Sequence, residues 1–220
     1  SQDIDGSTAH CRMLSKKGII PEDEAVAIIN ALAEIKREIA RGEFSAVDDY
    51  EDIHTLVEKA LIEKVGQKGE KVHTGRSRND QVALDARLYV REAIERDINL
   101  VKELQKSLVN LAEKNITVLM PGYTHMQPAQ PVLLSHHLLA YYEMLKRDFA
   151  RFADCKNRVN VMPLGSAALA GTTFDLDRSM VAEELGFETI SDNSMDAVSD
   201  RDFVLEYLFS ASVLMMHLSR

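Results

Sequence analysis

The polar segment at residues 73–81 has the composition of a binding site for anions. It reads His-Thr-Gly-Arg-Ser-Arg-Asn-Asp-Gln and carries a donor or a charge at almost every position. A long helical pattern follows it, and the backbone N–H groups at a helix N-terminus favour anions. The guanidinium groups of Arg76 and Arg78 add forked donors that match carboxylates. The alternative is a solvated loop in which Ser77 caps the helix and Asp80 completes a near capping box.

A second unusual segment, residues 121–131, contains three prolines and a histidine. The prolines forbid a continuing helix and stiffen the chain, so we expect a stiff loop between two long helices. His125 has Thr124 and Gln127 close by as hydrogen-bonding neighbours. An imidazole is the usual general acid or base near neutral pH, which makes His125 a candidate catalytic residue. The alternative is a structural connector whose histidine only satisfies a backbone group.

A third segment, Asp52-Ile53-His54-Thr55, fits the start of a helix. Its simplest interpretation is a cap at Asp52 followed by an exposed imidazole at His54. Four other histidines have no evident partners, namely His10, His136, His137 and His217. They lack the His-x-x-x-His or Cys-x-x-Cys spacing of zinc ligands, so we predict no structural metal site. The sequence also lacks a Walker loop, a Gly-x-Gly-x-x-Gly after a strand and a Gly-x-Ser-x-Gly elbow.

Helical periodicity accounts for most of the chain. Apolar residues at alternating spacings of three and four predict helices over residues 21–42, 51–65, 77–115, 131–160, 175–185 and from 196 to the end. The third would be about 58 Å long, a length typical of helix bundles. The last is apolar around much of its circumference, which predicts burial against another subunit. A soft boundary near residues 67–69 separates an N-terminal helical domain, residues 1–70, from a bundle domain, residues 71–220.

Composition excludes several classes of protein. The chain has 220 residues, 45% of them apolar and 28% charged, with a net charge of −9. An acidic balance argues against a general nucleic-acid binder. No run of apolar residues is long enough for a membrane span, and two distant cysteines are typical of a reduced, cytoplasmic protein. The absence of an initiator Met and an end inside an apolar run predict a piece of a longer protein.

Together, the three polar segments resemble the argininosuccinate lyase family of the fumarase/aspartase superfamily. Residues 73–81 are similar to that family's motif at every position, and residues 122–131 are similar to its Gly-Tyr-Thr-His-Met-Gln-Pro-Ala-Gln-Pro motif. The segment at residues 52–55 matches a third motif. The Asp5-Gly6-Ser7 start and the Leu-Gly-Ser and Leu-Ala-Gly-Thr sequences within residues 164–172 also fit. The resemblance therefore extends over all 220 residues.

The resemblance implies an all-α fold, a bundle of long helices of the fumarase/aspartase type, assembled as a homotetramer with sites where three subunits meet. It implies reversible β-elimination of argininosuccinate to arginine and fumarate by general acid–base catalysis, with no metal or organic cofactor. His125 would be the catalytic histidine. The implied substrate-binding residues are Asn79, Thr124, Arg78, Ser77 and His54.

The chain departs from the family in what it lacks. The family's catalytic base is a serine in a Gly-Ser-Ser-x-Met-Pro-x-Lys-x-Asn loop, and that pattern does not occur here. Family chains are also considerably longer, so we expect the 220 residues alone to be inactive. Two alternatives remain open. One is a structural protein of the δ-crystallin kind, and the other is a different lyase of the superfamily, such as adenylosuccinate lyase.

Overall fold

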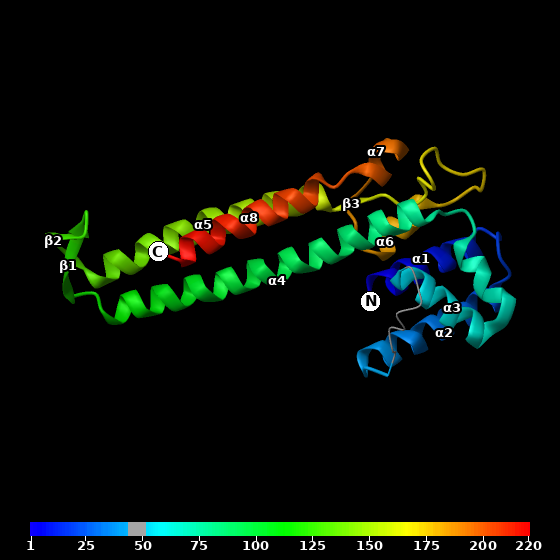
Figure 1. Cartoon of the computed structure of the whole chain (residues 1–220), viewed down its shortest axis with the longest axis horizontal. Helices are drawn as coiled ribbons and strands as arrows, with labels where there is room; N and C mark the ends of the chain where they lie inside the picture. The colour runs from blue at the N-terminus through cyan, green and yellow to red at the C-terminus, as the bar shows by residue number, and fades with distance from the viewer. Residues whose placement is uncertain (44–51) are drawn as a thin grey trace. The chain divides into compact units, whose positions relative to one another are not determined.

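The computed structural model describes residues 1–43 and 52–220. Most of the described residues are helical (Figure 1). The α-helices are α1 (Gln2–Lys16), α2 (Glu22–Ala40), α3 (Ile53–Val65), α4 (Arg78–Lys114), α5 (Leu134–Val159), α6 (Arg178–Glu184), α7 (Ser194–Ser199) and α8 (Asp202–Leu218). A 3₁₀ helix, η1 (Gly66–His73), links α3 to the segment before α4. The predicted helix start at residue 51 lies outside the described residues.

The chain divides into two compact units. The first contains residues 1–89 and 160–200, and the second contains residues 90–159 and 201–220. Helix α4 begins in the first unit and continues in the second. These units are defined by contacts within the chain, and the domain boundary near residue 70 stays a prediction. No described helix has both the length and the apolar character needed to cross a membrane.

The core of the first unit lies among α1, α2, α3 and the start of α4. The apolar face predicted for residues 21–42 is confirmed, because Ile28, Leu32 and Ile35 are fully buried. Leu61 of α3 and Leu84 of α4 join the same cluster. A two-stranded parallel pair, β3 (Val161–Met162) with β4 (Thr189–Ile190), and helix α6 complete this unit.

The second unit is built on α5 and α8 with the later part of α4. Phe152 of α5 is fully buried and its ring centroid lies 6.1 Å from that of Tyr207. Buried Asp148 accepts a hydrogen bond of 2.7 Å from Nδ1 of His217. These contacts hold α5 against α8, so the predicted long helices do form a bundle within this unit.

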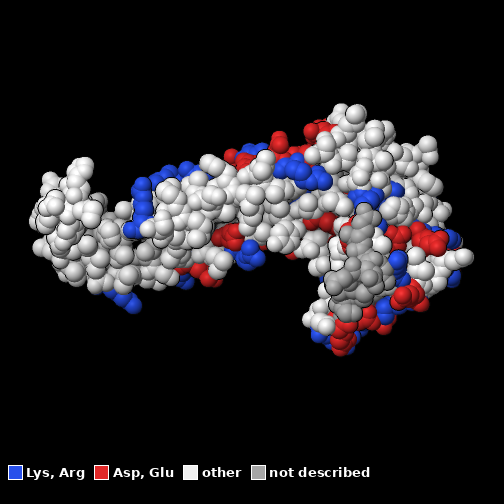
Figure 2. Space-filling model, in the orientation of Figure 1, with Lys and Arg blue, Asp and Glu red and all other residues white. Residues whose placement is uncertain are grey.

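The proline-rich segment is a β-hairpin, which corrects the predicted loop. Strand β1 (Leu119–Thr124) pairs antiparallel with β2 (Gln127–Leu133), and Pro121 lies opposite Pro131. Both strands of a two-stranded ladder are edges, where proline is tolerated. The helix predicted from residue 131 therefore begins at Leu134 instead. On the face shown in Figure 2, the end of the unit that carries the hairpin is mostly uncharged.

Two other helix predictions need correction. Helix α1 has no counterpart among the expected helices, since Gly6, Ser7 and Thr8 are poor helix formers and tertiary packing must stabilise it. The helix expected from residue 196 is split into α7 and α8, because Asp200 has an extended ψ of 130°. Helix α1 contacts the polar segment before α4, since Ser7 accepts a hydrogen bond of 3.0 Å from Nη2 of Arg76.

Candidate active site

The segment before α4 forms the capping arrangement that the sequence indicates. The backbone N–H of Ser77 donates to Oδ1 of Asp80 at 2.9 Å, and the N–H of Asn79 donates to Oγ of Ser77 at 3.3 Å. Both members of the box thus satisfy donors that a helix N-terminus leaves unpaired. The cap interpretation is confirmed. The cap fixes the backbone at the start of α4, from which the side chain of Asn79 projects.

Asp80 also binds a loop far away in the sequence. Its Oδ2 accepts hydrogen bonds from the backbone N–H groups of Gly165, at 3.0 Å, and Ala167, at 2.8 Å. Asp80 is completely buried, and burial raises the pKa of its carboxyl group although these N–H groups and Arg76 oppose the rise. Beside it, Nδ2 of the exposed Asn79 donates to the carbonyl of Ala168 at 2.9 Å.

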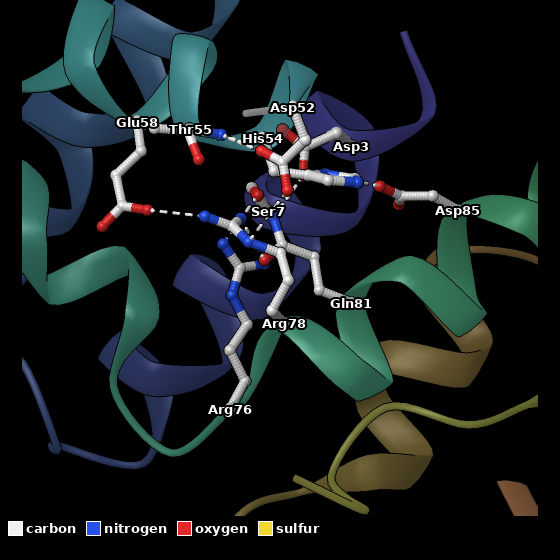
Figure 3. Close-up of polar contacts among 10 residues, drawn as sticks. All are labelled: Asp3, Ser7, Asp52, His54, Thr55, Glu58, Arg76, Arg78, Gln81 and Asp85. Carbon is white, nitrogen blue, oxygen red and sulfur yellow. Dashed lines mark hydrogen bonds and ion pairs between the residues drawn. The ribbon is translucent and has the colours of Figure 1, made fainter. Parts of the chain in front are cut away.

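Arg78 is engaged by two acidic side chains of the α3 region. Its Nε lies 3.6 Å from Oδ2 of Asp52 and its Nη2 lies 3.3 Å from Oε2 of Glu58 (Figure 3). Its Nη1 donates to Oε1 of Gln81 at 2.9 Å. Asp52 also caps α3, as predicted, by accepting a hydrogen bond of 2.7 Å from the N–H of Thr55. The guanidinium is therefore oriented, but a substrate carboxylate would have to share it with these groups.

His54 is buried between two carboxylates instead of being an exposed imidazole. Its Nδ1 lies 3.1 Å from Oδ1 of Asp3 and 3.3 Å from Oδ2 of Asp85 (Figure 3). Burial alone would lower the pKa of His54, but contact with Asp3 and the charges of Asp85 and Asp52 outweigh it and raise the pKa. Burial and the nearby charge of Asp3 raise the pKa of Asp85 to about 7. A protonated imidazole is thus favoured at this position.

The same three side chains are of the types that bind divalent cations. Ligand atoms of Asp3, His54 and Asp85 lie within 4.8 Å of one another. However, Gln81 already donates to Oδ1 of Asp3, and the buried guanidinium of Arg76 contributes a positive charge beside Asp3 and Asp85. Arg76 and an imidazolium at His54 are the positive charges that face the carboxyl groups of Asp3 and Asp85. We therefore interpret the cluster as ion pairs that join α1, α3 and α4.

Thr124 and His125 lie at the tip of the hairpin in the second unit. His125 has φ of 51° and Met126 has φ of 62°, and these two residues form the turn between paired Thr124 and Gln127. Positive φ at both positions is what type I′ turns require. Histidine adopts it more often than most residues, whereas Met126 adopts it at a cost. All four side chains are exposed. Such strain is found most often at functional sites, which agrees with a functional role for this turn.

The structure therefore groups the predicted site residues by unit. Ser77, Arg78, Asn79 and His54 come together around the start of α4, whereas Thr124 and His125 belong to the other unit. Sequence reasoning missed the roles of Asp85 and of residues 165–168. Asp85 follows Gln81 by one helical turn, so the two residues lie on the same face of α4, which also carries buried residues. Two polar residues on a buried face could have indicated from the sequence that Asp85 has a polar partner.

Comparison with known proteins places the whole chain in one family. A family model described as Lyase matches residues 1–220. The argininosuccinate lyase of Pelotomaculum thermopropionicum is 56% identical over 218 residues, which are 99% of this chain and 47% of that protein. The argininosuccinate lyase of Acinetobacter baumannii is 56% identical over 219 residues, which are 100% of this chain and 46% of that protein. The chain thus spans about half the length of these curated relatives.

Solved structures agree with the sequence comparison. The crystal structure of EDDS lyase in complex with formate matches with a TM-score of 0.88 and 32% identity, over 99% of this chain and 43% of that chain. A fumarate lyase:delta crystallin from Brucella melitensis matches with a TM-score of 0.83 at 18% identity over 99% of this chain and 53% of that chain, which supports the fold alone. The predicted long-helix fold is confirmed.

Proposed function

The chain belongs to the lyase family whose model spans it, and on that premise we propose that the protein containing it is an argininosuccinate lyase. The observation that carries the proposal is identity of 56% with two argininosuccinate lyases over essentially all of the chain. The reaction is reversible β-elimination of argininosuccinate to arginine and fumarate. It consists of two proton transfers and the cleavage of one C–N bond, and we propose that it proceeds without a metal or organic cofactor.

The chemistry assigns work to each part of the candidate site. A base removes a proton from the carbon next to a carboxylate, and the electron pair of that C–H bond passes into the carboxylate. The pair then forms the new double bond while the C–N bond breaks, and the leaving nitrogen takes up a proton. Fixed donors stabilise the charge that develops on the carboxylate. Asn79, Ser77 and Arg78 at the start of α4 are the donors that we propose for this task.

In this proposal His125 supplies the proton that the leaving nitrogen takes up. Its side chain is exposed at a two-residue turn, within reach of a bound molecule, and its backbone conformation is set by the hairpin. Thr124 beside it would contact the substrate. His54 is buried between Asp3 and Asp85. We therefore propose that it stabilises the packing around the start of α4 and does not contact the substrate directly. The base that removes the carbon proton is expected outside these 220 residues.

We propose a homotetramer in the cytoplasm, with sites completed by neighbouring subunits. Helix α8 exposes large apolar side chains, with Leu205, Phe209 and Met215 each more than 60% exposed. At the hairpin, Met126 is 93% exposed. Large exposed apolar patches mark interfaces, so we propose that these side chains pack against other subunits, and D₂ symmetry is the commonest arrangement of a tetramer.

The test is made on the full-length protein that contains this chain. Purified protein is mixed with argininosuccinate, and fumarate absorbance and arginine release are followed. His125→Asn should lower turnover by about 10²–10⁴, the usual range for a general acid or base, with a much smaller change in KM. His136→Asn, at an exposed histidine of α5, is the control and should leave turnover unchanged.

Two outcomes contradict the proposal. Failure of the full-length protein to release fumarate and arginine would remove the assigned activity. Turnover of His125→Asn within about threefold of the parent would remove the assigned role of His125. The 220-residue chain by itself is a further comparison and should release no detectable fumarate.

A further inference from the structure

Asp80 accepts more hydrogen bonds than its role as a helix cap requires. One carboxylate oxygen accepts the N–H of Ser77 within the capping box, and the other accepts the N–H groups of both Gly165 and Ala167. Capping boxes satisfy the donors of the helix itself. The two additional bonds join α4 to a loop 85 and 87 residues further along the chain. A buried carboxylate with three backbone donors is a strong, charge-assisted anchor.

The loop that Asp80 holds is in an unfavourable backbone conformation. Ala167 has φ of 51°, which L-amino acids other than Asn and Asp rarely adopt, and Gly165 has φ of 93°. Arg178 packs directly against Gly165 and donates through Nε to the carbonyl of Leu164 at 2.9 Å. Ser166 is buried and donates to the carbonyl of Pro163 at 2.7 Å. Such a conformation persists only when surrounding contacts over-determine it, and Asp80 supplies two of those contacts.

The anchored loop in turn orients the side chain of Asn79. The carbonyl of Ala168, one residue after the anchored Ala167, accepts a hydrogen bond from Nδ2 of Asn79. This bond fixes which end of the amide faces the loop. Asn79 is exposed, so Oδ1 and the second N–H of its amide are the groups that a substrate would contact. Asn79, Asp80 and residues 165–168 therefore form a closed ring of contacts at the start of α4.

We propose that Asp80 is a positioning residue, which sets the orientation of the Asn79 amide toward the substrate by anchoring residues 165–168. This inference rests on the proposed function, because it takes Asn79 as a substrate-binding residue. Asp80 itself is completely buried and has no surface with which to touch the substrate. Its effect on catalysis must therefore pass through the loop and Asn79.

The test compares steady-state kinetics of Asp80→Asn, Asn79→Ala and the double variant in the full-length protein. Asparagine keeps the shape of the side chain but loses the charge, and its NH₂ group cannot accept a backbone N–H. Asp80→Asn should raise KM about tenfold with a smaller change in kcat, as expected when a binding group loses its orientation. In the double variant KM should be close to that of Asn79→Ala alone, because Asp80 has nothing left to orient.

A matched control separates positioning from general stability. Asn193 accepts hydrogen bonds from the N–H groups of Met195, at 3.0 Å, and Asp196, at 3.1 Å, and caps α7 in the same unit. Asn193→Ala should lower the melting temperature while leaving KM unchanged. Hydrogen exchange of the peptide covering residues 163–171 is the second readout, and Asp80→Asn should speed it whereas Asn193→Ala should not.

These measurements distinguish the possible failures. A parent enzyme without lyase activity overturns the proposed function, whereas unchanged exchange of residues 163–171 in Asp80→Asn overturns the anchor. Multiplicative effects on KM in the double variant overturn the coupling between Asp80 and Asn79. If Asp80→Asn does not fold, Asp80→Glu keeps the charge but displaces the carboxylate by one methylene, and the same KM and exchange comparisons decide the inference.

Discussion

His10 should make the stability of this protein fall as the pH is lowered. The imidazole is completely buried in α1, and its Nε2 lies 2.8 Å from the carbonyl of Thr74, within the polar segment at residues 73–81. A carbonyl only accepts, so Nε2 carries the proton of a neutral ring. Burial and the charge of Arg76 lower the pKa of His10 from 6.5 to about 3. The folded protein therefore resists protonation of this ring.

The sign and size of the effect follow from linkage. The unfolded chain binds a proton on the same ring at its ordinary pKa of 6.5, so between pH 6.5 and about 3 it binds more protons than the folded chain. The contribution of His10 is full above pH 6.5 and is lost as the pH falls through this range. At about pH 5, protonation of the unfolded chain lowers the free energy of unfolding by about 2 kcal/mol.

Comparison with His10→Gln isolates this contribution. Asp85, with a pKa near 7, has the opposite pH dependence, so the profile of the parent protein alone is not diagnostic. We expect His10→Gln to be less stable than the parent near neutral pH, because it loses packing and an imidazole hydrogen bond. That deficit should shrink by about 2 kcal/mol between about pH 7.5 and pH 5.

Urea unfolding of the full-length protein at fixed concentration, followed by circular dichroism, measures the difference. His136→Gln, at an exposed histidine, is the control and should differ from the parent by the same amount at both pH values. If the deficit of His10→Gln changes by less than about 0.5 kcal/mol over this range, His10 is not the neutral buried group described above.

Two further substitutions test the packing around the site and in the bundle. Gly165→Ala should destabilise the protein by about 2 kcal/mol, since φ is 93° and a Cβ would lie 2.9 Å from Cγ and Cδ of Arg178. It should also raise the KM of the lyase reaction proposed above, and a melting temperature and KM equal to those of the parent would contradict this. Phe152→Ala should lower the free energy of unfolding, measured in urea, by about 3–5 kcal/mol, because the ring is fully buried against Tyr207. A decrease of less than about 1 kcal/mol would mean that this part of the bundle is not tightly packed.

Local features of the molecule could be determined from the sequence alone. The buried face of α2, the length of α4 and the capping roles of Asp52, Ser77 and Asp80 all follow from residue types at short spacings. Helix caps and periodic apolar faces involve residues within one or two turns, so the sequence contains the whole interaction. The motif containing Asn79 and the one containing His125 also indicated the family that the comparisons confirm.

Only the tertiary structure decided which distant groups meet. Three prolines suggested a loop, but pairing with a second strand made them part of a hairpin whose turn holds His125 at positive φ. An exposed imidazole was expected at His54, but Asp3 and Asp85 from two other helices enclose it. Asp80 has the pattern of a simple cap, yet it anchors a loop 85 residues away. Burial and long-range partners depend on how helices pack, and no local spacing of residues specifies them.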